Sequence, residues 1–122
     1  MTTAIFSQNG TSFEASISGH AGYNLGGPDI VCSACSVLTY TLLQCILSEE
    51  AHGAFQELHT TPDGAKLHMG GGDDGYFYIG VRCASWAQSR IEGIFDVITS
   101  GFALLSKQYP DFVKLSVRTG EK

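Results

Sequence analysis

The sequence predicts an α+β fold in which a mostly antiparallel sheet packs against two helices, in the order ββαβββαβ. Several short stretches alternate apolar and polar residues, which is the period of a half-buried strand. Two longer stretches repeat apolar residues at three- and four-residue steps, as in a helix that buries one side. Turn signals between neighbouring strands favour antiparallel pairing. Because the chain has 122 residues, we expect a single domain over residues 1–122.

The first two strands are expected over residues 4–7 and 12–18. Asn9-Gly10 lies between them, and this pair is a strong hairpin signal because both residues accept positive φ. Apolar residues of the second strand alternate onto one face, namely Phe13, Ala15 and Ile17. The pattern therefore predicts two paired strands with one buried face.

The first helix is expected from Ile30 to about Glu49. Its apolar stripe consists of Ala34, Val37, Leu38, Thr41, Leu42, Cys45 and Ile46. Pro28 suits the start of a helix, because its ring fixes φ near the helical value. Asp29 offers an acceptor and a negative charge to the exposed amides of the first turn. We expect the helix to bury its apolar stripe against the sheet.

The second half of the chain predicts a hairpin, a further strand, a helix and a last strand. Residues 53–60 and 65–69 are expected to pair across the turn sequence Thr61-Pro62-Asp63-Gly64. Alternation predicts strands over residues 76–82 and 112–117. Ser85 and Gln88 resemble a capping box at the start of the second helix, which should end near Tyr109-Pro110. The stripe of that helix consists of Ile91, Ile94, Phe95, Ile98, Phe102 and Leu105.

Composition and charge exclude several classes of protein. The chain is 43% hydrophobic and 16% charged, a balance typical of a compact globule rather than a disordered chain. Its formal net charge of −5 disfavours direct binding of nucleic acid, which depends largely on Lys and Arg. We read no apolar run of about 20 residues and no export signal at the N-terminus. The expectation is a cytoplasmic protein that does not enter a membrane.

The segment Gly19 to Leu38, GHAGYNLGGPDIVCSACSVL, carries the candidate catalytic residues. His20 and Cys32 lie on either side of a glycine-rich loop, and Cys32 is expected in the first turn of the helix. The helix dipole and a nearby imidazole both lower the pKa of a thiol, which makes the thiolate available at neutral pH. This arrangement is typical of a cysteine hydrolase with Cys32 as nucleophile and His20 as base.

Cys32 and Cys35 also have the C-x-x-C spacing of a redox dithiol or of half a zinc site. A structural zinc site needs four ligands, and neither a second such pair nor a matching histidine pair completes the set. A thioredoxin-like site needs a strand directly before the motif, where this chain has glycine-rich sequence. We therefore expect no metal and no cofactor, and we keep a thiol redox protein using Cys32 and Cys35 as an alternative.

The sequence resembles the ribosomal-processing cysteine protease (Prp) family in four features. These are the motif GHA, the motif DIVC, the eleven residues that lie between His20 and Cys32, and the small residue Ser36 after the cysteine. This resemblance implies a homodimeric bacterial endopeptidase that removes the N-terminal extension of large ribosomal subunit protein twenty-seven. It also implies that Cys32 and His20 are the catalytic pair. Two positions depart from the family pattern. Ser33 replaces a usual alanine or glycine, and Cys35 replaces a usual aliphatic residue, which favours a buried thiol there.

Further roles follow from this mechanism. The backbone amides of Cys32 and Ser33 are predicted to stabilise the oxyanion. Asp29 either orients the imidazole of His20 or caps the helix, and its position favours the cap. The glycines Gly22, Gly26 and Gly27 give the loop many backbone states, so it either closes over a peptide or simply makes the turn into the helix.

A non-catalytic module that binds a ribosomal protein or peptide is the second alternative. The acidic charge of the chain suits a basic ribosomal protein as partner. Substitution of Cys32 distinguishes the two functions, because a binding module keeps its partner without that thiol and a protease loses turnover.

Overall fold

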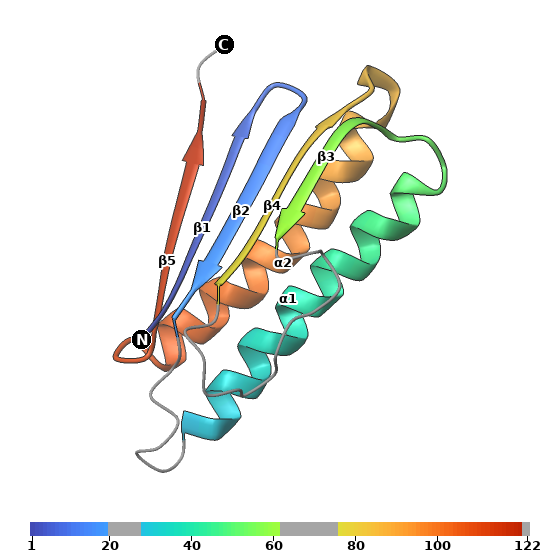
Figure 1. Ribbon diagram of the computed structural model, residues 1–122. Helices are drawn as coiled ribbons and strands as arrows, with labels where there is room; N and C mark the ends of the chain where they lie inside the picture. The colour runs from blue at the N-terminus through green and yellow to red at the C-terminus, as the bar shows by residue number, and fades with distance from the viewer. Residues whose placement is uncertain (20–27, 62–75, 121–122) are drawn as a thin grey trace.

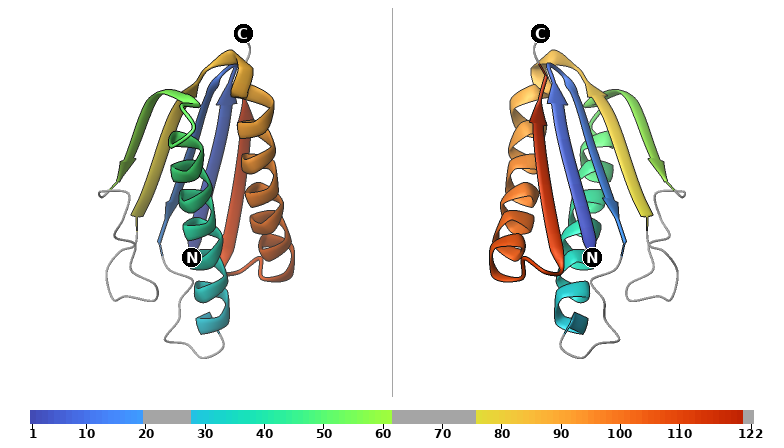
Figure 2. Two further views of the ribbon diagram at one scale, coloured as in Figure 1. Left: turned by 90° about the vertical axis from the view of Figure 1, so that its right-hand side faces the viewer. Right: turned by 90° about the vertical axis from the view of Figure 1, so that its left-hand side faces the viewer.

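The computed structural model describes residues 1–19, 28–61 and 76–120. A five-stranded sheet lies against two helices that both cover the same face, as Figures 1 and 2 show. The elements are β1 (Thr2–Asn9), β2 (Ser12–Ser18), α1 (Pro28–Glu50), β3 (Phe55–Thr61), β4 (Tyr76–Cys83), the 3₁₀ helix η2 (Ser85–Ala87), α2 (Gln88–Gln108) and β5 (Val113–Thr119). The predicted α+β class with two packed helices is confirmed.

The strand order is β3-β4-β2-β1-β5, and every pair is antiparallel except β1 with β5. The hairpin of β1 and β2 is confirmed, with Asn9 opposite Ser12 and Gly10 at φ +65° in the turn. The predicted strand over 65–69 and the turn before it at 62–64 lie outside the described residues. Within the described part, β3 pairs directly with β4.

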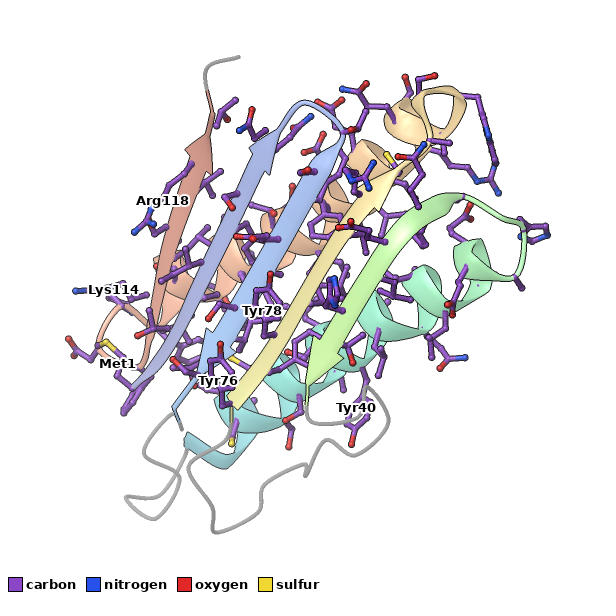
Figure 3. The ribbon with its side chains drawn as sticks, turned by 45° about the horizontal axis from the view of Figure 1, so that its top comes forward. Met1, Tyr40, Tyr76, Tyr78, Lys114 and Arg118 are labelled. Atoms are coloured by element: carbon purple, nitrogen blue, oxygen red, sulfur yellow. The ribbon has the colours of Figure 1, made fainter. Side chains whose placement is uncertain are left out.

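The core lies between the sheet and the helices. Alternate residues of β1 and β2 are buried, as the period of a half-covered strand requires. Phe6 and Phe13 from the sheet pack on Phe95 and Phe102 of α2, with ring centroids 5.2 to 6.4 Å apart. None of the described elements covers the other face of the sheet, and Tyr76 and Tyr78 lie on it (Figure 3).

The expected capping box at the start of the second helix is wrong. A 3₁₀ turn over Ser85–Ala87 precedes α2, and no side chain caps the start of that turn or of α2. Gln88 instead donates from Nε2 to the carbonyl oxygen of Gly10, 3.1 Å away. The side chain that was expected to close the helix start therefore ties α2 to the β1–β2 turn.

One helix contradicts the expectation that no apolar run is long enough to span a membrane. Among the described residues, Ile30–Glu50 passes that test by length and composition, with 39% of the most apolar window buried inside the protein. Leu42 and Ile46 in this segment are fully buried against the sheet. The core helix of a soluble protein passes the same test, so the finding is weak evidence for a membrane span.

Gly19 provides a test of how the end of β2 is held. Its φ is +87°, and a Cβ atom built there would overlap the carbonyl oxygen of Met1. We expect Gly19→Ala to lower the free energy of unfolding by about 3 kcal/mol, through left-handed strain and the clash together. Urea denaturation followed by circular dichroism measures the change.

Gly10→Ala is the matched control for Gly19→Ala. Gly10 also has positive φ, but a Cβ there meets nothing within 4 Å. This variant should lose only the strain, about 1–2 kcal/mol. Equal losses in the two variants would show that the contact between Gly19 and Met1 does not hold the end of β2.

Candidate active site

Cys32 lies on the face of α1 that packs against the sheet. The residue is 8% exposed, and the preceding Val31 is 1% exposed. Cys35, one turn further on, is also buried, whereas Ser33 faces solvent. The apolar stripe of the helix therefore fixes its rotation, and that rotation sets the direction of the Cys32 side chain.

The helix starts earlier than the sequence analysis expected. Because α1 runs from Pro28, Cys32 is its fifth residue and lies just beyond the first turn. In an α-helix each amide bonds to the carbonyl four residues before it, so the amides of Cys32 and Ser33 face the carbonyls of Pro28 and Asp29. The amides without a helical partner lie nearer the helix start. This placement argues against the expected oxyanion role of the Cys32 and Ser33 amides.

Cys35 has a distinct chemical environment beside Cys32. Burial, followed by Coulombic repulsion from Cys32, raises the pKa of Cys35 from 9.0 to about 11, while a side-chain hydrogen bond with Thr2 acts to lower it. The carbonyl oxygen of Cys35 accepts a hydrogen bond of 2.8 Å from Oγ1 of Thr39. Cys35 is therefore a protonated thiol at neutral pH, held between the helix and the start of β1.

The first two residues of the chain contact both the end of β2 and α1. Thr2 is 2% exposed, and its amide donates to the carbonyl oxygen of Phe112 at 2.8 Å. Met1 contacts Gly19, the residue directly before His20. Figure 1 shows the start of β1, the end of β2 and the first turns of α1 at the same end of the molecule. Contacts thus run from Gly19 through Met1 and Thr2 to Cys35 of α1.

Several predicted site residues lie outside the described part of the chain, namely His20, Gly22, Gly26 and Gly27. The backbone of Asp29 lies in the first turn of α1, and Cys32 and Ser33 follow in the same helix. The structure therefore describes the helix that carries the candidate nucleophile and the strand end that leads to the candidate base.

Sequence reasoning missed the role of Thr2. The signal was the alternation Thr2, Ala4, Phe6, which places Thr2 on the buried face of β1. A threonine at the start of a strand is usually read as exposed, because polar residues are seldom fully buried. Its neighbour Cys35 explains the exception, since the thiol interacts with the Thr2 side chain.

Among residues 1–19, 28–61 and 76–120, no group of three or more His, Cys, Asp and Glu side chains forms a potential metal site. The four cysteines are free thiols. Cys83 lies at the far end of β4, where its amide bonds to the carbonyl oxygen of Thr11 at 2.9 Å. The thiols nearest to one another in the chain are therefore Cys32 and Cys35.

Comparison with known protein families shows the family to which the chain belongs. Residues 1–114 match the family described as cysteine protease Prp. The chain belongs to the Prp family of cysteine proteases. The matched range includes both GHA and DIVC, so the resemblance read from the sequence is confirmed.

Solved structures share the Prp fold over almost the whole chain. SMU.848 from Streptococcus mutans has a TM-score of 0.69 at 24% identity, covering 98% of this chain and 96% of its own. The essential ribosomal processing protease Prp from S. aureus, in complex with a covalently linked product peptide, has a TM-score of 0.65 at 18% identity, covering 96% and 99%. The same S. aureus protease with a substrate peptide has a TM-score of 0.63 at 15% identity, with the same coverage. No curated protein matches the chain.

The titration of Cys35 provides a test of its burial. Because its folded pKa is raised, the thiol contributes stability that is fully present below pH 9 and is lost as the pH rises through about 11. Between pH 8.5 and about 11, the wild type should lose about 2–3 kcal/mol more of its free energy of unfolding than Cys35→Ala. Urea denaturation with a reducing agent measures both proteins.

The slope of the free energy of unfolding against pH is compared between the two proteins. This comparison separates the titration of Cys35 from the cavity that Cys35→Ala leaves, because a cavity lowers the free energy of unfolding by the same amount at each pH. Cys83, whose pKa is also raised by burial, titrates in both proteins and cancels. Parallel losses of stability in the wild type and the variant would contradict the assigned environment of Cys35.

Proposed function

We propose that this Prp-family protease removes the N-terminal extension of large ribosomal subunit protein twenty-seven, with Cys32 as nucleophile and His20 as general base. The observation that carries the proposal is the family match over residues 1–114, which contains both residues. Further support comes from the S. aureus structures of the same fold, which are described as a ribosomal processing protease with substrate and product peptides.

The mechanism is acyl transfer. His20 takes the proton of the Cys32 thiol, and the sulfur attacks the scissile carbonyl carbon. The tetrahedral intermediate collapses as the C–N bond breaks, and His20 returns the proton to the leaving amine. Water then hydrolyses the thioester and regenerates the thiol. Amides near the start of α1 lack helical partners and lie at the positive end of the helix dipole, so they supply the natural oxyanion donors.

The partner and the assembly follow from charge and from the helix surface. A net charge of −5 suits a basic ribosomal protein as substrate in the cytoplasm. We include a homodimer in the proposal, in keeping with the family resemblance. The outer side of α1 offers a contact for it, because Ile30, Val37 and Leu47 are 69%, 54% and 37% exposed.

Peptide cleavage tests the proposed function. The substrate is the N-terminal extension peptide of ribosomal protein twenty-seven from the same organism, and mass spectrometry identifies the products. We expect one cut with the wild type, and a loss of at least about a thousandfold in kcat/KM in Cys32→Ala and in His20→Ala. Cys83→Ala is the matched control, because that thiol lies at the other end of the sheet and should be dispensable.

Cleavage that survives Cys32→Ala would contradict the nucleophile assignment. A peptide that binds equally to the wild type and Cys32→Ala, without being cut by either, would favour the non-catalytic binding module. A thiol-disulfide exchange activity that depends on both Cys32 and Cys35 would favour the redox protein.

Asp29→Asn separates the two roles open to Asp29. Because α1 starts at Pro28, Asp29 lies within its first turn rather than at the capping position. We expect kcat/KM within about tenfold of the wild type, because asparagine keeps a side-chain acceptor there and loses only the charge that favours the helix dipole. The thermal midpoint should likewise change by only a few degrees. A loss of a thousandfold or more in kcat/KM with an unchanged thermal midpoint would instead show that Asp29 orients the imidazole.

A further inference from the structure

Cys32 and Cys35 are placed so that a bond between them is geometrically accessible. They are three residues apart in α1, which sets their Cα atoms about 5 Å apart by α-helical geometry. Disulfides span Cα separations of about 4.4–6.8 Å. Both side chains lie on the buried face of the helix, at 8% and 5% exposure, and both thiols are free.

Neither remaining thiol competes for this pairing. Cys45 lies ten residues beyond Cys35 in the same helix, about 15 Å along its axis. Cys83 lies at the end of β4 beside Thr11, whereas Thr2, which contacts Cys35, lies at the opposite end of the sheet. An oxidised Cys32 therefore has one thiol within reach, and that thiol is Cys35.

We propose that Cys32 and Cys35 form a reversible disulfide when a hydroperoxide oxidises Cys32, and that this bond protects the nucleophile and switches proteolysis off. The protective role rests on the proposed function, since it takes Cys32 as the reactive thiolate. The disulfide itself is a modification site that is measured independently of proteolysis.

The chemistry takes place in two steps. The Cys32 thiolate attacks the terminal oxygen of the hydroperoxide, the O–O bond breaks, and an alcohol or water leaves once its oxygen is protonated. Cys32 is now a sulfenic acid. The sulfur of Cys35 then attacks the sulfur of Cys32, the S–O bond breaks, and hydroxide leaves with the proton of Cys35 as water. Two electrons pass from the thiols to the hydroperoxide, and an external dithiol reverses the change by exchange.

The surroundings of Cys35 suit it to act only after Cys32 has been oxidised. The negative charge of the Cys32 thiolate is one of the causes that raise the pKa of Cys35. A sulfenic acid is neutral, so this repulsion disappears in the first step. The hydrogen bond with Thr2 then favours the Cys35 thiolate. Burial is the largest cause of the raised pKa of Cys35 and remains after the first step, so the loss of this repulsion lowers that pKa only in part.

The disulfide would spare Cys32 from irreversible damage. A sulfenic acid without a partner thiol is oxidised further to sulfinic acid, which dithiols do not reduce.

The experiment treats the full-length protein with hydrogen peroxide and measures its intact mass, then its activity on the extension peptide before and after dithiothreitol. We expect the wild type to lose about 2 Da and to regain its activity with dithiothreitol. Cys35→Ala should gain about 32 Da as a sulfinic acid, and at least ten times less of its initial activity should return. Cys45→Ala is the matched control and should behave as the wild type does.

A wild type that gains oxygen without losing 2 Da would overturn the proposal, and so would a 2 Da loss that persists in Cys35→Ala. A cross-linked dimer on a non-reducing gel would also overturn it, because the bond would then lie between two chains. Cys35→Ser replaces Cys35→Ala if the latter does not fold. Failure of the proposed function appears separately, as no cleavage by the untreated enzyme, while the mass still reports the disulfide.

Discussion

The packing of α1 against the sheet is the constraint on which the candidate site depends. Val31, Leu42 and Ile46 are almost completely buried on one side of this helix. Rotating the helix by one residue would move this stripe by about 100° and expose it to water. Cys32 is buried on the same side, so the free energy that buries the core also fixes the direction of the candidate nucleophile. Stability and the geometry of the candidate site therefore depend on one helix orientation.

The central strands position the rest of the site through the backbone. β1 lies between β2 and β5, so its first residues are held on both sides by ladder hydrogen bonds. Met1 and Thr2 then connect the end of β2 with the buried face of α1. This arrangement holds the residue before His20 close to the helix that carries Cys32. The end of the central strand β2 thus leads to the candidate base, and α1 carries the candidate nucleophile.

The elements that the sequence predicted best are those whose signals are local. The β1–β2 hairpin follows from Asn9-Gly10 and alternation, and the stripe of α2 follows from helical spacing. The predicted stripe of α1 is wrong in part, because Val37 and Thr41 are exposed, whereas Val31, Cys32 and Cys35 are buried. The parallel pairing of β5 with β1 has no local signal, because it depends on α2 crossing the sheet. The capping box failed for a related reason, since Gln88 gains a partner at Gly10 that is distant in sequence.

The residues of the candidate site also differ in whether their signals are local in the sequence. Cys32 and His20 were predicted from short motifs, because a family motif consists of residues that are close together in the sequence. Thr2 was missed because its importance comes from Cys35, which is 33 positions away in the chain. The start of α1 at Pro28 moved the free amides away from Cys32, although the first-turn placement looked natural from the apolar pattern beginning at Ile30. Polar residues near a helix start can belong to the helix, and a prediction based on the spacing of apolar residues leaves them out.

Cys35 shows why burial and redox chemistry are compatible explanations of one residue. A buried thiol and a redox dithiol are competing interpretations of Cys35 in the sequence, since burial disfavours the thiolate that redox chemistry needs. Burial is the largest cause of the raised pKa of Cys35, and repulsion from Cys32 is the second. A charge that suppresses Cys35 while Cys32 is a thiolate is absent once Cys32 is a neutral sulfenic acid. In the proposed disulfide, the same residue would be a buried neighbour of Cys32 before oxidation and its partner afterwards, so burial and redox chemistry describe two states of one pair.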